Sequence, residues 1–151
     1  METTRETVYA ADSEKILGAV MSNAEMAKHA VITVLGYVNR EDLKSSLKDE
    51  IIKYDGFIER AKSLAGEKQM EIQKTSKIGK SAAEKMIKLK LLFDKSNCKI
   101  VEMLVKGTTN GVIDMAKAIK IADKADEQAI TLAKELLTYE ENEVNKMRHF
   151  I

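Results

Sequence analysis

The chain lacks proline and tryptophan altogether, and aromatic residues make up only 5% of its 151 residues. Proline breaks or kinks helices, whereas alanine, leucine, lysine, glutamate and methionine favour them. A proline-free chain rich in these residues is therefore predicted to be all-helical with short connections. Its length fits a single domain, residues 1–151, with enough chain to bury a core.

Cysteine, charge imbalance and long apolar runs are scarce as well. The single cysteine, Cys98, excludes an intramolecular disulfide, and the formal net charge of +1 gives no strong attraction to nucleic acid. No apolar run reaches the roughly 20 residues that span a bilayer, and the N-terminus lacks the pattern of a secretory signal. We therefore expect a cytoplasmic protein with no nucleic-acid partner. No phosphate loop, dinucleotide fingerprint or cysteine cluster indicates an enzyme.

Four segments repeat apolar residues at intervals of three and four, which is the spacing of one helix face. They cover residues 12–37, 39–65, 97–122 and 123–147, and the predicted caps of the last three are Asn39, Ser96 and Asp123. Such helices bury their stripes only against one another, so the pattern predicts an antiparallel four-helix bundle.

The remaining segments are expected to be a tail and a crossover. Residues 1–11 are predicted to be frayed, and residues 66–79 to form a long loop. Residues 80–93 are predicted to form a short amphipathic helix in the crossover between the second and third bundle helices. One face of this helix carries Ala82, Met86, Leu89 and Phe93, and beside it lie Ala83, Ile87 and Leu91. A single helix over 80–122 is the alternative to a break near Ser96.

The third bundle helix contains a segment of weak helix formers. Its predicted apolar stripe consists of Ile100, Leu104, Gly107, Gly111, Asp114, Ala118 and Ile121. Each interior glycine costs about 0.5–1 kcal/mol relative to alanine. One interpretation is close packing, in which Tyr54 or a methionine approaches the two glycines. The other is a kink that opens a polar pocket at Thr108, Thr109, Asn110 and Asp114. We favour close packing.

Two acidic residues fall on predicted apolar stripes, Asp114 and Glu140, and a buried carboxylate needs a partner or a shifted pKa. One interpretation is a metal site for iron, manganese or zinc that uses Asp114, Glu140 and Glu102. Against it, neither His29 nor His149 completes the Glu-x-x-His pair that is typical of di-iron bundles. The favoured interpretation places both acids at the edges of their stripes, near lysines, with no cofactor.

Charge is unevenly distributed along the chain. The basic segment, residues 74–95, holds seven lysines and two acids, whereas residues 123–143 hold seven acids and two lysines. These segments could face each other within the fold or across a dimer. A basic amphipathic helix at 80–93 could also lie on an anionic membrane, although it lacks the tryptophan, tyrosine and arginine that are common at such surfaces.

The segment Glu102-Met103…Gly107…Gly111-Val112-Ile113-Asp114 resembles a motif of short, uncharacterised bacterial helical proteins that are ferritin-like in architecture. The resemblance covers the last third to half of the chain and departs at Asn110, where methionine is frequent. It implies an antiparallel bundle that can self-associate, and it brings no catalytic residues.

The sequence thus favours a non-enzymatic bundle that works through protein–protein contacts, with a protein partner or a second copy of itself. The alternatives are a ferritin-like metal-binding protein and, less favoured, a peripheral membrane protein attached through residues 80–93.

Overall fold

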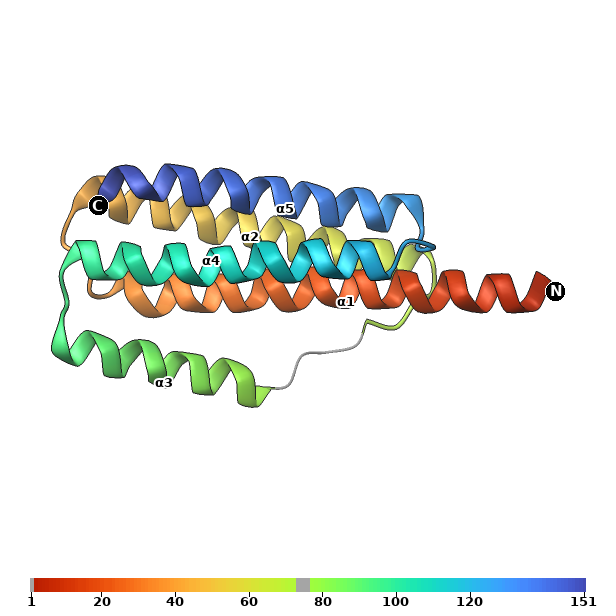
Figure 1. Ribbon diagram of the computed structural model, residues 1–151, viewed down its shortest axis with the longest axis horizontal. Helices are drawn as coiled ribbons and strands as arrows, with labels where there is room; N and C mark the ends of the chain where they lie inside the picture. Colours follow the sequence, from red (N-terminus) through yellow and green to blue (C-terminus); the bar gives the residue numbers. More distant parts are fainter. Residues whose placement is uncertain (1, 73–76) are drawn as a thin grey trace.

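The computed structural model describes residues 2–72 and 77–151, and the regular structure in these ranges is entirely helical (Figure 1). Five α-helices and a terminal 3-10 turn follow one another: α1 Glu2–Leu35, α2 Glu41–Glu67, α3 Lys77–Phe93, α4 Asn97–Ile121, α5 Glu127–Met147 and η1 Arg148–Phe150. The all-α prediction is confirmed.

Four long helices, α1, α2, α4 and α5, pack side by side, whereas α3 lies outside them (Figure 1). Short connections at 36–40 and 122–126 make α1 antiparallel to α2 and α4 antiparallel to α5. Helix α3 carries the chain back along the molecule, so that α4 starts at the same end as α2. In doing so α3 packs against α1 and, less extensively, against α4.

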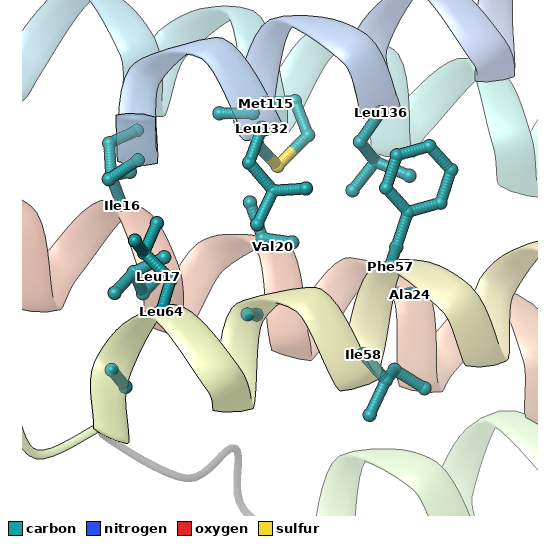
Figure 2. Packing of buried hydrophobic residues seen from close by; sticks show 14 of the residues in the cluster. Ile16, Leu17, Val20, Ala24, Phe57, Ile58, Leu64, Met115, Leu132 and Leu136 are labelled. Atoms are coloured by element: carbon teal, nitrogen blue, oxygen red, sulfur yellow. The ribbon is translucent and has the colours of Figure 1, made fainter. Parts of the chain in front are cut away.

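The core consists of the apolar stripes of the four long helices (Figure 2). Buried residues on α1 include Leu17, Val20, Ala24, Val31 and Val34, as their spacing predicts. The stripes predicted for α2 and α5 are likewise buried along most of their length. Full burial of a large aliphatic side chain contributes about 1.5–3 kcal/mol, so these faces hold the fold together.

Some predicted boundaries are wrong. Residues 1–11 were expected to be frayed, but α1 begins at Glu2, and the hydroxyl of Tyr9 donates to Asp126 near the start of α5. The expected loop at 66–79 is shorter, because α2 continues to Glu67 and α3 begins at Lys77; residues 73–76 of that prediction lie outside the described residues. The predicted break before α4 is confirmed, since residues 94–96 between α3 and α4 are not helical.

Of the three predicted helix caps, one is confirmed and two are wrong. Ser96 caps α4 as predicted, because its Oγ accepts from the backbone nitrogen of Lys99 at 3.2 Å. Asn39 does not cap α2, which is preceded by Arg40 without a side-chain capping bond. Asp123 lies in the turn after α4, and Asp126 caps α5 instead.

The inward face of α4 differs from the predicted stripe. Its buried residues are Ile100, Val101, Leu104 and Met115, whereas Asp114 and Ile121 are exposed. A repeat of 3.5 residues drifts about 20° per heptad around a straight α-helix. Over the length of α4 this drift carries the C-terminal part of the predicted stripe out of the core.

Candidate functional site

A cavity of about 610 Å³ lies between α1, α3 and α4. Its apolar wall includes Ala19, Met26, Ala27, Met86, Met103 and Met115, and Tyr54 of α2 and Glu140 of α5 reach it from the core. Gly107 and Gly111 of α4 line the cavity. An ideal Cβ at Gly107 would meet no atom within 4 Å, so the missing side chain leaves open space there.

The surroundings of the two glycines therefore differ from the close packing that we expected. Nothing fills the space at Gly107, where Tyr54 or a methionine was expected. At Gly111 the approach is close but polar: a Cβ would lie 2.8 Å from Oδ1 of Asn23 and 3.2 Å from Oε2 of Glu140. Four predicted pocket residues line the cavity together with Tyr54, namely Gly107, Thr108, Asn110 and Gly111. Asp114 also lines it, from an exposed position.

Asn23 and Glu140 form the polar floor of the cavity. Nδ2 of Asn23 donates to the carbonyl oxygen of Gly111 and to Oε2 of Glu140, both at 3.1 Å. Glu140 is 0% exposed, and its Oε1 lacks a hydrogen-bond partner, as does the hydroxyl of Tyr54. Burial raises the pKa of Glu140 to about 7, although the hydrogen bond from Asn23 and the nearby hydroxyl of Tyr54 act to lower it. A carboxyl group in this setting changes its charge near neutral pH.

Two further buried acids, Glu50 of α2 and Glu143 of α5, lie close to each other between these helices. Burial and, to a smaller extent, the neighbouring Glu143 together raise the pKa of Glu50 to about 8, whereas Lys146 acts to lower it. This pair was not predicted from the sequence. The available signal was spacing, because Glu50 lies three residues after Leu47 and four before Tyr54, on the apolar stripe of α2.

The three predicted metal ligands do not come together. Glu140 is buried at the floor, Asp114 is exposed at the rim, and Glu102 forms an ion pair with Lys106 at 2.7 Å. Within the described part of the chain, no three side chains of His, Cys, Asp or Glu gather as metal ligands would. Nε2 of His29 lies 2.9 Å from Oε2 of Glu84 on α3. The metal site stays a prediction to which the structure adds no ligand set.

Helix α3 has two apolar faces, and the one named first in the sequence analysis points outward. Leu91 is buried and Ile87 half-buried, both from the second face. The outward side chains of Met86, Leu89, Leu92 and Phe93 are 58%, 57%, 73% and 87% exposed. Among the helices of residues 2–72 and 77–151, none is long and apolar enough to cross a membrane.

Lysines border this outer face. The side chains of Lys85, Lys88 and Lys90 are exposed. Glu84 turns toward the four long helices and pairs with His29 of α1. Its Oε1 also lies 2.6 Å from Nζ of Lys88. The outer face of α3, defined here as Ala82, Lys85, Met86, Leu89, Leu92 and Phe93, is thus apolar and positively charged. The side chains of Lys74, Lys77 and Lys80 lie outside the described residues.

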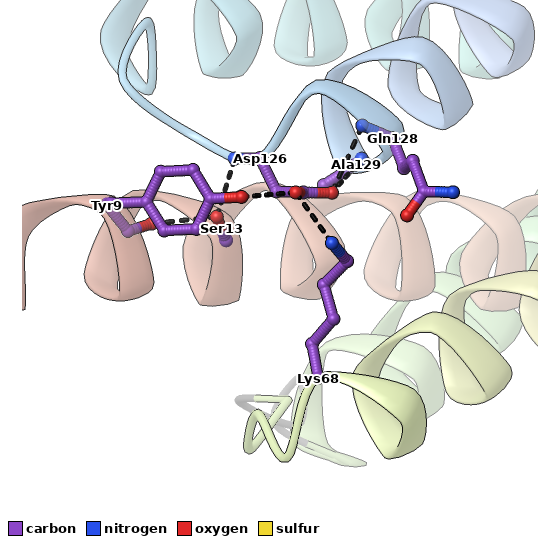
Figure 3. Close-up of polar contacts among 6 residues, drawn as sticks. All are labelled: Tyr9, Ser13, Lys68, Asp126, Gln128 and Ala129. Carbon is purple, nitrogen blue, oxygen red and sulfur yellow. Dashed lines mark hydrogen bonds and ion pairs between the residues drawn. The ribbon is translucent and has the colours of Figure 1, made fainter. Parts of the chain in front are cut away.

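The acidic segment 123–143 is paired elsewhere. Glu135 binds Arg60 of α2 at 2.5 Å, and Asp126 binds Lys68 at 2.8 Å. Figure 3 shows Asp126 at the centre of a network in which it also accepts from the hydroxyl of Tyr9 and the backbone of α5. This network joins α1, the end of α2 and the start of α5, which indicates a structural role.

Comparisons with models of protein families, with curated proteins and with solved structures find no match for this chain.

Proposed function

We propose that this protein is a non-enzymatic, ferritin-like four-helix bundle that attaches to anionic lipid surfaces through the outer face of α3. The observation that carries the proposal is the exposure of Met86, Leu89, Leu92 and Phe93 on one helix bordered by lysines. The bundle architecture is supported by the two antiparallel helix pairs and by α3 in the crossover between them.

The energetics of this face suit a membrane interface. Amphipathic helices lie in that interface with leucine and phenylalanine inserted and with lysine at the headgroups. Full burial of a leucine or phenylalanine contributes about 1.5–3 kcal/mol. Because Leu92 and Phe93 are mostly exposed in solution, most of this free energy is still to be gained when they insert into a membrane. A lysine near an anionic surface adds about 1 kcal/mol. Lys85 stands within the face, and Lys88 and Lys90 flank it.

A protein partner fits this face less well, although it is the interpretation that the sequence favours. Protein interfaces are enriched in tyrosine, tryptophan and arginine and depleted in lysine, whereas this face contains Lys85 and is flanked by Lys88 and Lys90. Two copies of the face placed against each other would also bring lysines together. An anionic bilayer supplies both the apolar layer and the opposite charge.

The test is co-sedimentation with vesicles of phosphatidylcholine alone or mixed with phosphatidylserine. We expect binding to the mixed vesicles at low salt and its loss at high salt. Leu92→Ser should weaken binding, whereas Ile121→Ser, at a side chain of α4 that is 72% exposed, should not. Lys85→Glu should likewise weaken it, with Lys53→Glu on α2 as the matched charge control.

Two results would contradict the proposal. One is failure of the wild-type protein to sediment with the mixed vesicles. The other is equal sedimentation of the Leu92→Ser and Ile121→Ser proteins. A concentration-dependent dimer that Leu92→Ser abolishes, without vesicle binding, would instead support self-association through the outer face of α3.

A further inference from the structure

We infer that the cavity between α1, α3 and α4 is a binding site for a small, mainly apolar molecule that carries a protonated amino group. This site shares Met86 with the outer face of α3, but its floor lies on α1, α4 and α5, so its existence does not depend on lipid attachment. The sequence indicated a polar pocket beside Gly107 and Gly111, but not the apolar wall or the ligand class inferred here.

The size and wall of the cavity define the body of the ligand. Small-molecule sites typically enclose about 300–1,000 Å³, and this cavity of about 610 Å³ falls within that range. Met26, Met86, Met103 and Met115 contribute to the wall. Methionine is flexible and makes favourable contacts with aromatic rings, so the wall can adapt to a ring or a short alkyl chain.

The floor defines the head of the ligand. Oε1 of Glu140 has no hydrogen-bond partner although the residue is 0% exposed, and an unpaired buried acceptor is costly. A protonated amine carries several donors and a positive charge, so it satisfies this oxygen and neutralises the carboxylate. Oδ1 of Asn23 faces the gap at Gly111 and offers a second acceptor.

Asn23 controls access to Glu140. Its Nδ2 bridges the carbonyl oxygen of Gly111 and Oε2 of Glu140, so it covers the carboxylate from the side of α1. A charged donor forms a stronger hydrogen bond to a carboxylate than a neutral amide does. The incoming amine therefore displaces the Asn23 amide from Glu140.

The other charged groups around the cavity also bear on the charge of the ligand's head. His29 of α1 pairs with Glu84, and Lys106 of α4 pairs with Glu102. Asp114 of α4 lies at the rim and adds negative charge. Lys90 of α3 also lines the cavity, and it would favour a carboxylate head placed at the rim instead.

Three probes with one body separate these possibilities: phenethylamine, phenethyl alcohol and phenylacetate. Calorimetric titration above pH 7 should show the amine binding most tightly. Glu140→Gln should weaken the amine at least about tenfold, the equivalent of one charge-assisted hydrogen bond, and leave the alcohol unchanged. Asp114→Asn, which removes an exposed acid at the rim, should have the smaller effect.

A second pair of variants tests the cavity without touching the floor. Gly107→Leu places a side chain in the open space and should abolish binding of the amine and the alcohol. Gly56→Leu makes the same change at an exposed glycine of α2, which also has nothing within 4 Å, and should leave binding intact. Both variants are expected to fold, so this pair decides the question even if Glu140→Gln unfolds.

The pH dependence adds a readout that packing alone would not give. Amine affinity should fall when the pH is lowered through about 7, because Glu140 then takes up a proton. Tyr54, Lys90, Lys106, Asp114 and His29 also face the cavity. The Glu140→Gln protein therefore measures the part of the pH dependence that comes from these other groups.

Four outcomes would overturn the inference. The amine and the alcohol could bind equally with Glu140→Gln having no effect, which would leave a purely apolar pocket. Phenylacetate could bind best and lose affinity in Lys90→Met, which would place an anionic head at the rim. Finally, none of the probes could bind, or Gly107→Leu could bind them all as the wild type does.

Discussion

The two glycines of α4 should respond in opposite ways to the same substitution. Glycine to alanine within a helix normally stabilises by about 0.5–1 kcal/mol, because alanine loses less conformational freedom on folding. At Gly107 the new methyl group meets nothing within 4 Å, so Gly107→Ala should gain this amount. At Gly111 the methyl carbon would lie 2.8 Å from Oδ1 of Asn23, so that side chain must move.

Moving Asn23 breaks two hydrogen bonds, one to the carbonyl oxygen of Gly111 and one to Glu140. Each contributes about 0.5–1.5 kcal/mol, and more when the acceptor is charged. After the gain in helix propensity, Gly111→Ala should be destabilising by about 1–2 kcal/mol, which corresponds to a melting temperature lower by several degrees.

Urea unfolding followed by circular dichroism measures both effects, with Gly56→Ala on the exposed side of α2 as the control for propensity. We expect Gly107→Ala and Gly56→Ala to be more stable than the wild type and Gly111→Ala to be less stable. If all three variants gain the same stability, Asn23 is not held at Gly111 and the polar floor described above is incorrect.

Two further predictions concern buried acids. Because the pKa of Glu50 is raised to about 8 by burial and by Glu143, the folded state binds this proton more tightly than the unfolded state does. Stability should therefore fall as the pH rises from about 4.5 to about 8, by at most about 1.4 kcal/mol per unit, and Glu50→Gln should flatten the slope in urea titrations. Asp126→Ala should cost about 1–2 kcal/mol at pH 7 through loss of the α5 cap, whereas Asp126→Asn should retain most of the cap. Burial acts to raise the pKa of Asp126, but hydrogen bonds from Lys68 and Tyr9 lower it overall. The contribution of the Asp126 carboxylate to the free energy of unfolding should therefore disappear as the pH falls below about 4. A wild-type acid titration that matches that of Asp126→Ala would contradict this.

Helix content and most core positions could be predicted from the sequence because burial follows spacing. The stripes of α1, α2 and α5 are apolar along nearly their whole length, so small errors in register do not change which residues are inside. On α4 the glycines and Asp114 blur the pattern. The predicted repeat put Asp114 on the apolar stripe; the favoured interpretation placed it at the edge of that stripe, and it is exposed. The cap of α5 was missed because Asp123 and Asp126 both precede an apolar run.

The candidate site was harder to predict because its parts are far apart in the chain. Asn23 carries no local signal, and it meets Gly111 and Glu140 only when α1, α4 and α5 pack together. The two faces of α3 were visible in the sequence, but spacing alone cannot say which of them turns inward. Leu91 decides this through its contact with the core at the end of the four long helices.

Helix α3 takes part in both proposed activities, so they should be thermodynamically coupled. Its side chains of Ala83, Ile87 and Lys90 line the cavity, while Leu92 and Phe93 extend from the opposite side. Met86 belongs to both surfaces, because it lines the cavity and is also 58% exposed. A vesicle that binds α3 and shifts it must change the cavity, and a ligand in the cavity must change α3.

Linkage requires that the two effects be equal in size. If phenethylamine alters the affinity for phosphatidylserine vesicles by some factor, the vesicles must alter the affinity for phenethylamine by the same factor. Both affinities can be measured by titration in either order, and Met86→Ala, which removes the shared side chain, should reduce the coupling. Independent binding, with neither affinity changed by the other ligand, would show that α3 stays fixed on the four long helices when it meets a membrane. Both sites would then stand, but α3 would be a rigid anchor and not a link between them.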